Sequence, residues 1–144
     1  MKRIENLRVL VIDDEPAVLR VLVLMLKKIG LKEIDTAENG EQGIRRIDEN
    51  TYDLVFTDIE MPGLKGTQVL DHIRKRNPST SVIGISGTPW LLTEQFDAAL
   101  PKPFTKTDLV EILDTIDIQP RHSNSKKKRS YKQENTRINP PSSS

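Results

Sequence analysis

The sequence predicts a single α/β domain in which a parallel sheet is covered by helices on both faces. Two observations carry this prediction. Short apolar segments rich in β-branched residues recur along the chain and end abruptly at polar residues, which is typical of strands buried on both faces. Between them, apolar residues recur at spacings of three and four, which is typical of amphipathic helices. Strands that alternate with helices in this way form parallel sheets with right-handed crossovers.

The first strand and the first helix are expected near the amino end of the chain. Residues 9–12 (VLVI) form an apolar run that ends at Asp13 and Asp14. Pro16 then favours the start of a helix, and Gly30 favours its end. Between these two residues, a stripe of apolar side chains predicts the buried face of the helix. The stripe consists of Val18, Val21, Leu22, Met25, Leu26 and Ile29.

The same order of strand, loop and helix recurs as far as residue 118. Further strands are expected at residues 33–36, 54–57, 81–86 and 98–100. The later helices are expected to carry Ile44 and Ile47, then Val69, Leu70 and Ile73, and finally Leu109, Leu113 and Ile116. Thr105 and Asp108 have the spacing of a capping box at the start of the last helix.

Charge divides the chain into two parts. Residues 1–118 carry 15 Lys and Arg against 20 Asp and Glu, whereas residues 119–144 carry 7 against 1. The net charge of +1 therefore combines an acidic domain, residues 1–118, with a basic tail, residues 119–144. The tail lacks hydrophobic periodicity, so we expect it to be disordered. Its run Lys126 to Arg129 would be solvated, or would touch nucleic acid or an acidic membrane surface.

Composition also indicates the compartment. The chain contains no cysteine, which excludes disulfides and thiolate metal sites and suits a reducing cytosol. No apolar run approaches the roughly 20 residues of a membrane span, and the amino end does not have the pattern of a secretory signal. We therefore expect a cytoplasmic protein without a membrane segment.

Polar side chains follow four of the predicted strands. Asp13 and Asp14 follow the first strand and Asp58 the third, while Ser86 ends the fourth and Lys102 follows the fifth. Because ligands bind outside the carboxyl ends of parallel strands, we expect these five side chains at one edge of the sheet. Three carboxylates repel one another unless a hard divalent cation binds, and Mg²⁺ is the first candidate. A lysine and a hydroxyl beside such a metal suit a phosphoryl group.

Each of these residues also has a purely structural interpretation. An aspartate before Pro16 would cap the first helix. Asp58 would begin a turn, and Ser86 would be an ordinary loop residue. Lys102 would be a solvated surface lysine. The joint placement of these residues at strand ends favours a functional site.

Four segments of the sequence resemble the receiver domain of bacterial two-component response regulators. These segments are VLVIDDEP, LVFTDIEMPGLKG, VIGISG and LPKPF. Their order and spacing are highly specific, and the resemblance covers about residues 6–118. It implies a flavodoxin-like (βα)₅ fold, a doubly wound parallel sheet with strand order 2-1-3-4-5. This fold agrees with the alternation of strands and helices described above.

The resemblance also implies a role for each residue of the site. Asp58 matches the phosphoacceptor, which takes a phosphoryl group from a phosphohistidine of a sensor kinase. The residues that match the metal-binding set are Asp13, Asp14, Asp58 and, through its backbone carbonyl, Glu60. Mg²⁺ is the cofactor that this set implies. Ser86 and Lys102 match the hydroxyl and the ammonium that bind the phosphoryl group, and Pro103 is a candidate for a cis peptide bond.

The partners implied by the resemblance are a sensor histidine kinase or a phosphotransfer protein, and an unidentified protein target. The expected function is a stand-alone receiver that signals by protein contact or phosphorelay and catalyses only its own phosphorylation and dephosphorylation. Because no helix-turn-helix pattern follows residue 118, we expect no sequence-specific DNA binding. Two alternatives stay open. One is a pseudo-receiver that acts without phosphorylation, and the other is a small phosphohydrolase with Glu60 as its acid/base.

The sequence departs from the family pattern in two places. Ala99 stands three residues before Lys102, where the family usually carries Tyr or Phe. Ser86 and Lys102 are only 16 residues apart, so we expect the fourth helix to be shortened or missing. The large apolar residues of this segment would either form a partner surface or cover the sheet where the helix is lost. They are Trp90, Leu91, Leu92 and Phe96.

Overall fold

The computed structural model describes residues 4–91 and 95–118, and the predicted basic tail lies outside the described residues. The strands are β1 (Arg8–Ile12), β2 (Glu33–Ala37), β3 (Leu54–Asp58), β4 (Ser81–Ser86) and β5 (Ala98–Pro101). The helices are α1 (Pro16–Ile29), α2 (Gly40–Glu49), α3 (Gly66–Arg76) and α4 (Lys106–Thr115), together with a short 3₁₀ turn, η1 (Pro89–Leu91). Every predicted strand is therefore present.

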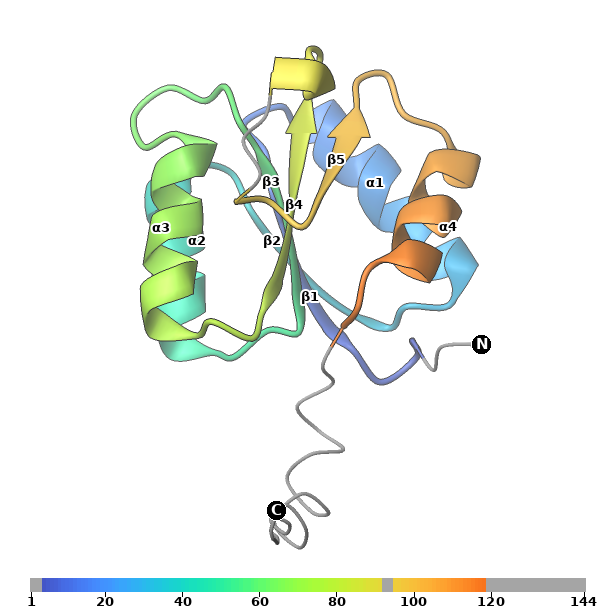
Figure 1. Cartoon of the computed structure of the whole chain (residues 1–144), viewed down its shortest axis with the longest axis horizontal. Coiled ribbons are helices and arrows are strands. Elements are labelled where there is room, and N and C mark those ends of the chain that lie inside the picture. Colours follow the sequence, from blue (N-terminus) through green and yellow to red (C-terminus); the bar gives the residue numbers. More distant parts are fainter. Residues whose placement is uncertain (1–3, 92–94, 119–144) are drawn as a thin grey trace, which may run out of the picture.

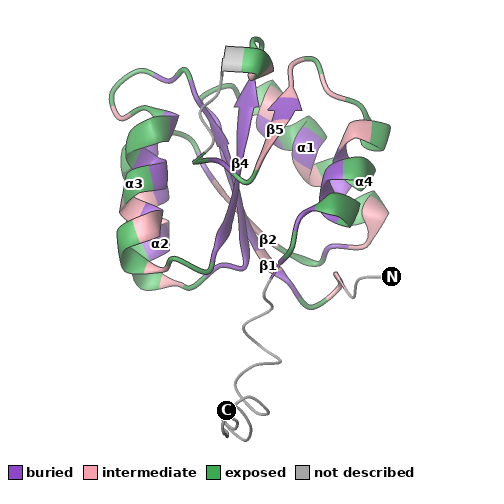
Figure 2. Ribbon diagram, in the orientation of Figure 1, coloured by how far each residue is buried: buried purple, intermediate pink, exposed green. Residues whose placement is uncertain are grey.

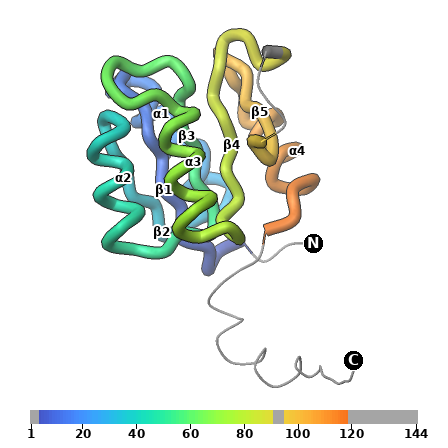
Figure 3. The backbone as a smooth tube through the Cα atoms, turned by 60° about the vertical axis from the view of Figure 1, so that its left-hand side comes forward, coloured from blue at the N-terminus to red at the C-terminus, as the bar shows by residue number. Residues whose placement is uncertain are grey.

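The five strands form one parallel sheet in the order β2-β1-β3-β4-β5. Helices α1 and α4 cover one face of this sheet, and α2 and α3 cover the other (Figure 1). Figure 3 shows α2 and α3 packed side by side over their face. The predicted doubly wound fold is confirmed. Because all strands point the same way, their carboxyl ends meet at one edge, which we call the carboxyl edge.

The central strands supply most of the core. Every residue of β3 and β4 is buried (Figure 2). Alternate side chains point to opposite faces, so that Phe56 belongs to the same core cluster as Leu22 of α1, while Val55 belongs to the cluster that contains Leu70 of α3. Each fully buried side chain of this size contributes roughly 1.5–3 kcal/mol to folding. The sheet is therefore a rigid base for the loops at its carboxyl edge.

Helix α1 buries two residues of the predicted stripe, Leu22 and Leu26, together with Leu19, which lies outside that stripe. Val21, which the spacing places on the buried face, is 44% exposed, and Leu24 is 59% exposed. Apolar residues occupy nearly the whole circumference of α1, so their spacing alone does not single out the inner face. None of the helices in the described part of the chain, α1 included, has the length and apolar character needed to cross a membrane.

The connection between β4 and β5 confirms the prediction that the helix between the fourth and fifth strands is shortened or missing. Within its described residues η1 is the only helical element, and residues 92–94, which include Leu92, lie outside the described part. Phe96 is buried and joins the core cluster beneath α2 and α3, so it covers the sheet there. Trp90, by contrast, is 75% exposed. Thus the two aromatic residues of this segment have opposite environments.

Asp97 fixes this short connection to its surroundings. Its Oδ2 accepts a hydrogen bond from the Val82 backbone N–H at 2.7 Å and one from Arg74 Nη2 at 2.9 Å. Arg74 Nη2 also donates to the Gln95 carbonyl at 2.8 Å. Helix α3 therefore contacts the residues just before β5 through Arg74.

Candidate functional site

Two neighbouring strands bring three aspartates together at the carboxyl edge. Asp13 and Asp14 follow the end of β1, and Asp58 is the last residue of β3, with Ile12 paired to Thr57 in the sheet. One carboxylate oxygen of each aspartate lies within 4.8 Å of those of the other two. Asp13 and Asp58 are buried, whereas Asp14 is exposed. The residues predicted to bind a metal through their side chains are thus clustered.

Asp13 is fully enclosed by the protein. Its Oδ1 accepts a hydrogen bond from the Glu15 backbone N–H at 2.9 Å. Its Oδ2 has no hydrogen-bond donor among the described residues, and the ammonium of Lys102 lies 3.4 Å away. Burial raises the pKa of Asp13. A buried oxygen without a donor is costly, and a cation held between the aspartates would satisfy it. The set of oxygen ligands fits Mg²⁺.

Asp58 lies between opposing electrostatic influences. Its pKa is raised to about 6, first by burial and second by the charge of Asp13, while Lys102 and a backbone hydrogen bond from Glu60 act in the opposite direction. At pH 7 the carboxyl group is therefore mainly ionised. A bound divalent cation would favour the ionised form further. The Glu60 side chain is exposed.

The backbone that carries Asp58 packs directly against the start of α3. The Gly66 N–H donates to the Ile59 carbonyl at 3.2 Å. A Cβ atom at position 66 would lie only 2.4 Å from the Asp58 carbonyl oxygen. Only glycine permits this approach, so Gly66 helps to fix the end of β3.

Lys102 approaches the aspartates from the end of β5. Its ammonium lies 3.2 Å from Glu15 Oε1, 3.4 Å from Asp13 Oδ2 and 3.5 Å from Asp58 Oδ1. Burial alone would lower the pKa of Lys102, but the charges of Asp13 and Asp58 outweigh burial and raise it. Lys102 is therefore a positive charge held beside the Asp58 carboxylate, and not a solvated surface lysine.

Ser86 ends β4 and is buried. Its Oγ accepts a hydrogen bond from the Thr88 backbone N–H at 2.9 Å and lies 3.3 Å from Thr88 Oγ1. Its carbonyl accepts a hydrogen bond from the Lys102 backbone N–H at 2.9 Å, and the peptide bond between Lys102 and Pro103 is cis. The strand ends that the sequence singled out therefore meet at one edge of the sheet.

Glu15 is a residue of this site that the sequence reasoning missed. It occupies the N-cap position of α1, but its side chain makes no capping hydrogen bond. Its carboxylate instead pairs with Lys102. The alternative in which an aspartate before Pro16 caps α1 is therefore wrong. The available signal was the position of Glu15, directly after two aspartates at the end of a buried strand.

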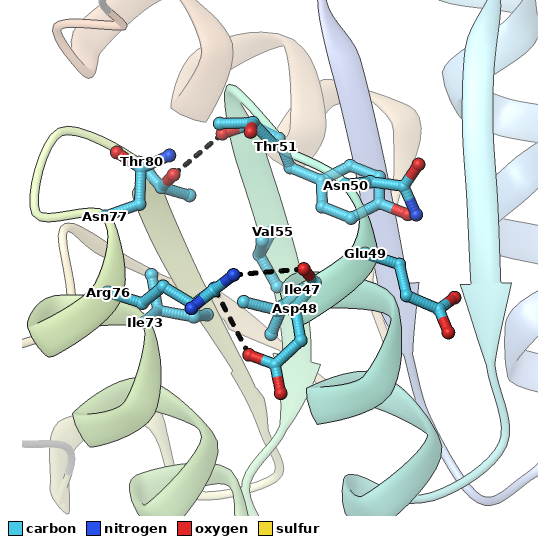
Figure 4. A pocket seen from close by; sticks show the side chains of 11 residues that line it. Ile47, Asp48, Glu49, Asn50, Thr51, Val55, Ile73, Arg76, Asn77 and Thr80 are labelled. Atoms are coloured by element: carbon cyan, nitrogen blue, oxygen red, sulfur yellow. Dashed lines mark hydrogen bonds and ion pairs between the residues drawn. The ribbon is translucent and has the colours of Figure 1, made fainter.

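A pocket lies at the opposite end of the fold, between the carboxyl ends of α2 and α3 (Figure 4). Arg76 donates to the Asp48 carbonyl at 3.0 Å and lies 3.2 Å from its carboxylate. Thr80 Oγ1 donates to the Tyr52 carbonyl at 2.7 Å. These groups bond one another, and none of the residues predicted for the functional site lines this pocket.

Comparison with known proteins gives a consistent family match. A model described as the response regulator receiver domain matches residues 9–114. The probable chemotaxis protein CheY of Rhizobium etli is 34% identical over 96 residues, which cover 67% of this chain and 70% of the relative. The transcriptional regulatory protein ResD of Bacillus subtilis is 32% identical over 116 residues, which cover 76% of this chain and 48% of the relative.

A third relative is longer still. The protein-glutamate methylesterase/protein-glutamine glutaminase 2 of Koribacter versatilis is 34% identical over 97 residues, which cover 67% of this chain and 27% of that protein. The chain thus spans less than half of this relative and of ResD. Residues 9–114, which match the family model, contain the acidic cluster.

Solved structures show the same fold. The response regulator protein TrrA of Thermotoga maritima, in complex with Mg²⁺-BeF, is 37% identical with a TM-score of 0.68, and the match covers 74% of this chain and 96% of TrrA. A response regulator receiver domain protein of Clostridium thermocellum is 33% identical with a TM-score of 0.67, and the match covers 75% of this chain and 91% of that protein.

Proposed function

The chain belongs to the response regulator receiver domain family, and we propose that it accepts a phosphoryl group on Asp58 in a Mg²⁺-dependent reaction. The observation that carries this proposal is the Asp58 carboxylate, which is buried beside Asp13, Asp14 and Lys102 at the carboxyl edge. The donor is a phosphohistidine of a histidine kinase or of a phosphotransfer protein.

The reaction needs little chemistry from the protein beyond placement and charge. An Asp58 carboxylate oxygen attacks phosphorus, the P–N bond to the donor imidazole breaks, and the electron pair leaves with the imidazole. Asp58 needs no general base because it is mainly ionised at neutral pH. Lys102 neutralises charge on the transferred group from 3.5 Å away. Water later hydrolyses the acyl phosphate and restores the carboxylate.

The metal is held by oxygen ligands in this proposal. The residues that would bind Mg²⁺ are Asp13, Asp14, Asp58 and the backbone carbonyl of Glu60. Bound there, the ion would neutralise charge on the phosphoryl oxygens. TrrA, described in complex with Mg²⁺-BeF, supports this assignment because it shares the fold and 37% of aligned residues. Ser86 would donate its hydroxyl to the phosphoryl group after leaving its contact with Thr88.

The output is proposed to be contact with a protein target or transfer of the phosphoryl group along a phosphorelay. The domain of residues 1–118 would carry this activity in the cytosol without sequence-specific DNA binding. Basic residues 119–144 are proposed to be a disordered tail.

The direct test is incorporation of acid-labile phosphate from acetyl phosphate. The wild type is expected to take up about one phosphate per chain with Mg²⁺ and none with a chelator. Asp58→Asn is expected to take up none. Asp71→Asn is the matched control, because Asp71 is an exposed aspartate on α3. Equal labelling of both variants would contradict the proposal.

A second candidate function is a binding module that does not depend on phosphorylation. It is favoured by Ala99, which stands where the family usually has an aromatic residue, and by the short turn η1, which stands where the family has a helix between its fourth and fifth strands. The two functions differ in one observable. Amide NMR shifts around Trp90 and β5 should change on addition of Mg²⁺ and beryllofluoride if phosphorylation controls the output, and should stay constant in a passive module.

A further inference from the structure

Three carboxylates share one ammonium at the carboxyl edge. Lys102 Nζ lies closest to Glu15 Oε1, at 3.2 Å, and this contact is a hydrogen bond. The two contacts with Asp13 and Asp58 are longer, at 3.4 Å and 3.5 Å. The nearest partner of Lys102 is therefore an acid that lies outside the aspartate cluster.

The backbone of Glu15 is fixed by the turn that carries the aspartates. Its N–H donates to Asp13 Oδ1 at 2.9 Å, and its carbonyl accepts hydrogen bonds from Val18 and Leu19 at 3.0 Å and 3.1 Å. Its side chain, by contrast, is 60% exposed, whereas the side chains of Asp13 and Asp58 are 0% and 5% exposed. A carboxylate at this position reaches Lys102 but is readily solvated when released.

An ammonium has three N–H donors, and here three carboxylates surround it. A phosphoryl group on Asp58 would add oxygen acceptors on the same side, and the existing contacts of the ammonium would then compete with them. Asp13 and Asp58 are buried and remain beside the bound group. The contact with exposed Glu15 is the one that water can replace at least cost.

We propose that Glu15 is a positioning residue that competes with the phosphoryl group for the Lys102 ammonium. This inference rests on the proposed function of Asp58. It predicts that removing the Glu15 contact makes Lys102 more available and tightens binding of a phosphoryl mimic.

Binding of beryllofluoride at saturating Mg²⁺ tests this competition, measured by calorimetry on the full chain. Glu15→Gln removes the charge and Glu15→Asp keeps the charge but shortens the reach. Both are expected to bind beryllofluoride about 3-fold more tightly than the wild type. Glu38→Gln is the matched control, because Glu38 is an exposed acid directly after β2 at the same edge and lies outside the three carboxylates around Lys102.

Binding of Mg²⁺ alone distinguishes an effect of the length of the side chain at position 15 from an effect of its charge. Glu15→Asp should leave Mg²⁺ affinity unchanged while it tightens beryllofluoride binding. If only Glu15→Gln tightens binding, or if Glu38→Gln has the same effect, general charge explains the result and the positioning role is overturned. If both Glu15 variants match a wild type that binds beryllofluoride, the inference fails while the proposed function stands. A wild type that binds no beryllofluoride overturns both.

Discussion

Two buried aspartates, one at each end of the sheet, differ in what surrounds them. Asp53 lies just before β3, is 1% exposed, and accepts a hydrogen bond from the Arg8 backbone N–H at 2.8 Å. Asp13 lies just after β1 and is equally buried, but its Oδ2 has no hydrogen-bond donor among the described residues. The buried aspartate before β3 thus accepts a backbone hydrogen bond, whereas one oxygen of Asp13 lacks a hydrogen bond and faces the Lys102 ammonium at 3.4 Å.

The neighbouring acids at the two ends of the sheet differ in the same way. Near the amino end, Asp35 Oδ2 accepts a hydrogen bond from the Tyr52 hydroxyl at 2.6 Å and lies 3.4 Å from Arg8 Nη2. Burial and this hydrogen bond raise the pKa of Tyr52, which keeps it a donor. At the carboxyl edge, one lysine serves several acids. Acids with their own donors stabilise the fold, whereas the crowded acids at the carboxyl edge are the groups that the proposed cation would stabilise.

The largest stability change is expected from Asp53→Ala. The substitution leaves the part-buried Arg8 N–H without its charged acceptor, so the free energy of unfolding should fall by about 3 kcal/mol. Urea denaturation measures this loss. Asp53→Asn, which keeps an acceptor oxygen, should lose less. A change within error for the alanine variant would show that this end of the sheet does not depend on its acid.

Asp58→Asn is expected to stabilise the metal-free protein, whereas Asp53→Ala destabilises it. The pKa of Asp58 is about 6 in the fold against an ordinary value of 3.8 for an aspartate, so the folded state binds more protons between these values and stability falls as pH rises from about 4 to about 6. Removing the charge should stabilise the protein by about 2 kcal/mol at pH 7. It should also flatten this pH dependence. Destabilisation at pH 7 would contradict the account of the carboxyl edge.

Mg²⁺ should relieve the same crowding without any substitution. At a concentration ten times its Kd, the ion should raise the free energy of unfolding by about 1.4 kcal/mol, because it binds only the folded state. Thermal unfolding in matched Mg²⁺ and K⁺ solutions of equal ionic strength measures this gain. Asp13→Asn should lose it, while Asp53→Asn should retain it. An equal gain for both variants would indicate a general salt effect.

The smallest change in stability is expected from Asp48→Asn, because Asp48 is exposed whereas Asp53 and Asp58 are buried. Asp48 is exposed and paired with His72 at 2.8 Å and Arg76 at 3.2 Å, and its pKa is lowered first by the hydrogen bond to His72. Exposed pairs are screened by water and contribute little. The unfolding midpoint should therefore move less than for any variant above, and a larger shift would show that partners matter more than burial.

Most of the fold follows from local patterns in the sequence. The fully apolar runs of β3 and β4 predict buried strands because few other structures place such runs between turn residues. Helix α1 is different: its apolar residues surround the helix, and only packing against the sheet decides that Leu19 is buried and Val21 exposed. A spacing rule cannot make that distinction.

The site also contains residues that local sequence patterns predict and contacts that they do not predict. The three aspartates, Ser86 and Lys102 are placed by strand ends, which the sequence marks clearly. The contact between Glu15 and Lys102 joins residues 87 positions apart and depends on side-chain reach, which no local pattern encodes. The burial of Phe96 beside an exposed Trp90 likewise depends on how the short connection folds over the sheet.

The most direct test of the central claim is to locate the phosphorylated residue chemically. After reaction with acetyl phosphate and Mg²⁺, borohydride reduces an aspartyl phosphate to homoserine, and peptide mass spectrometry reads its position. The account predicts homoserine at position 58 alone, dependent on Mg²⁺ and absent from Asp58→Asn. Homoserine at position 13 or 14, or none in a protein that binds Mg²⁺, would contradict it.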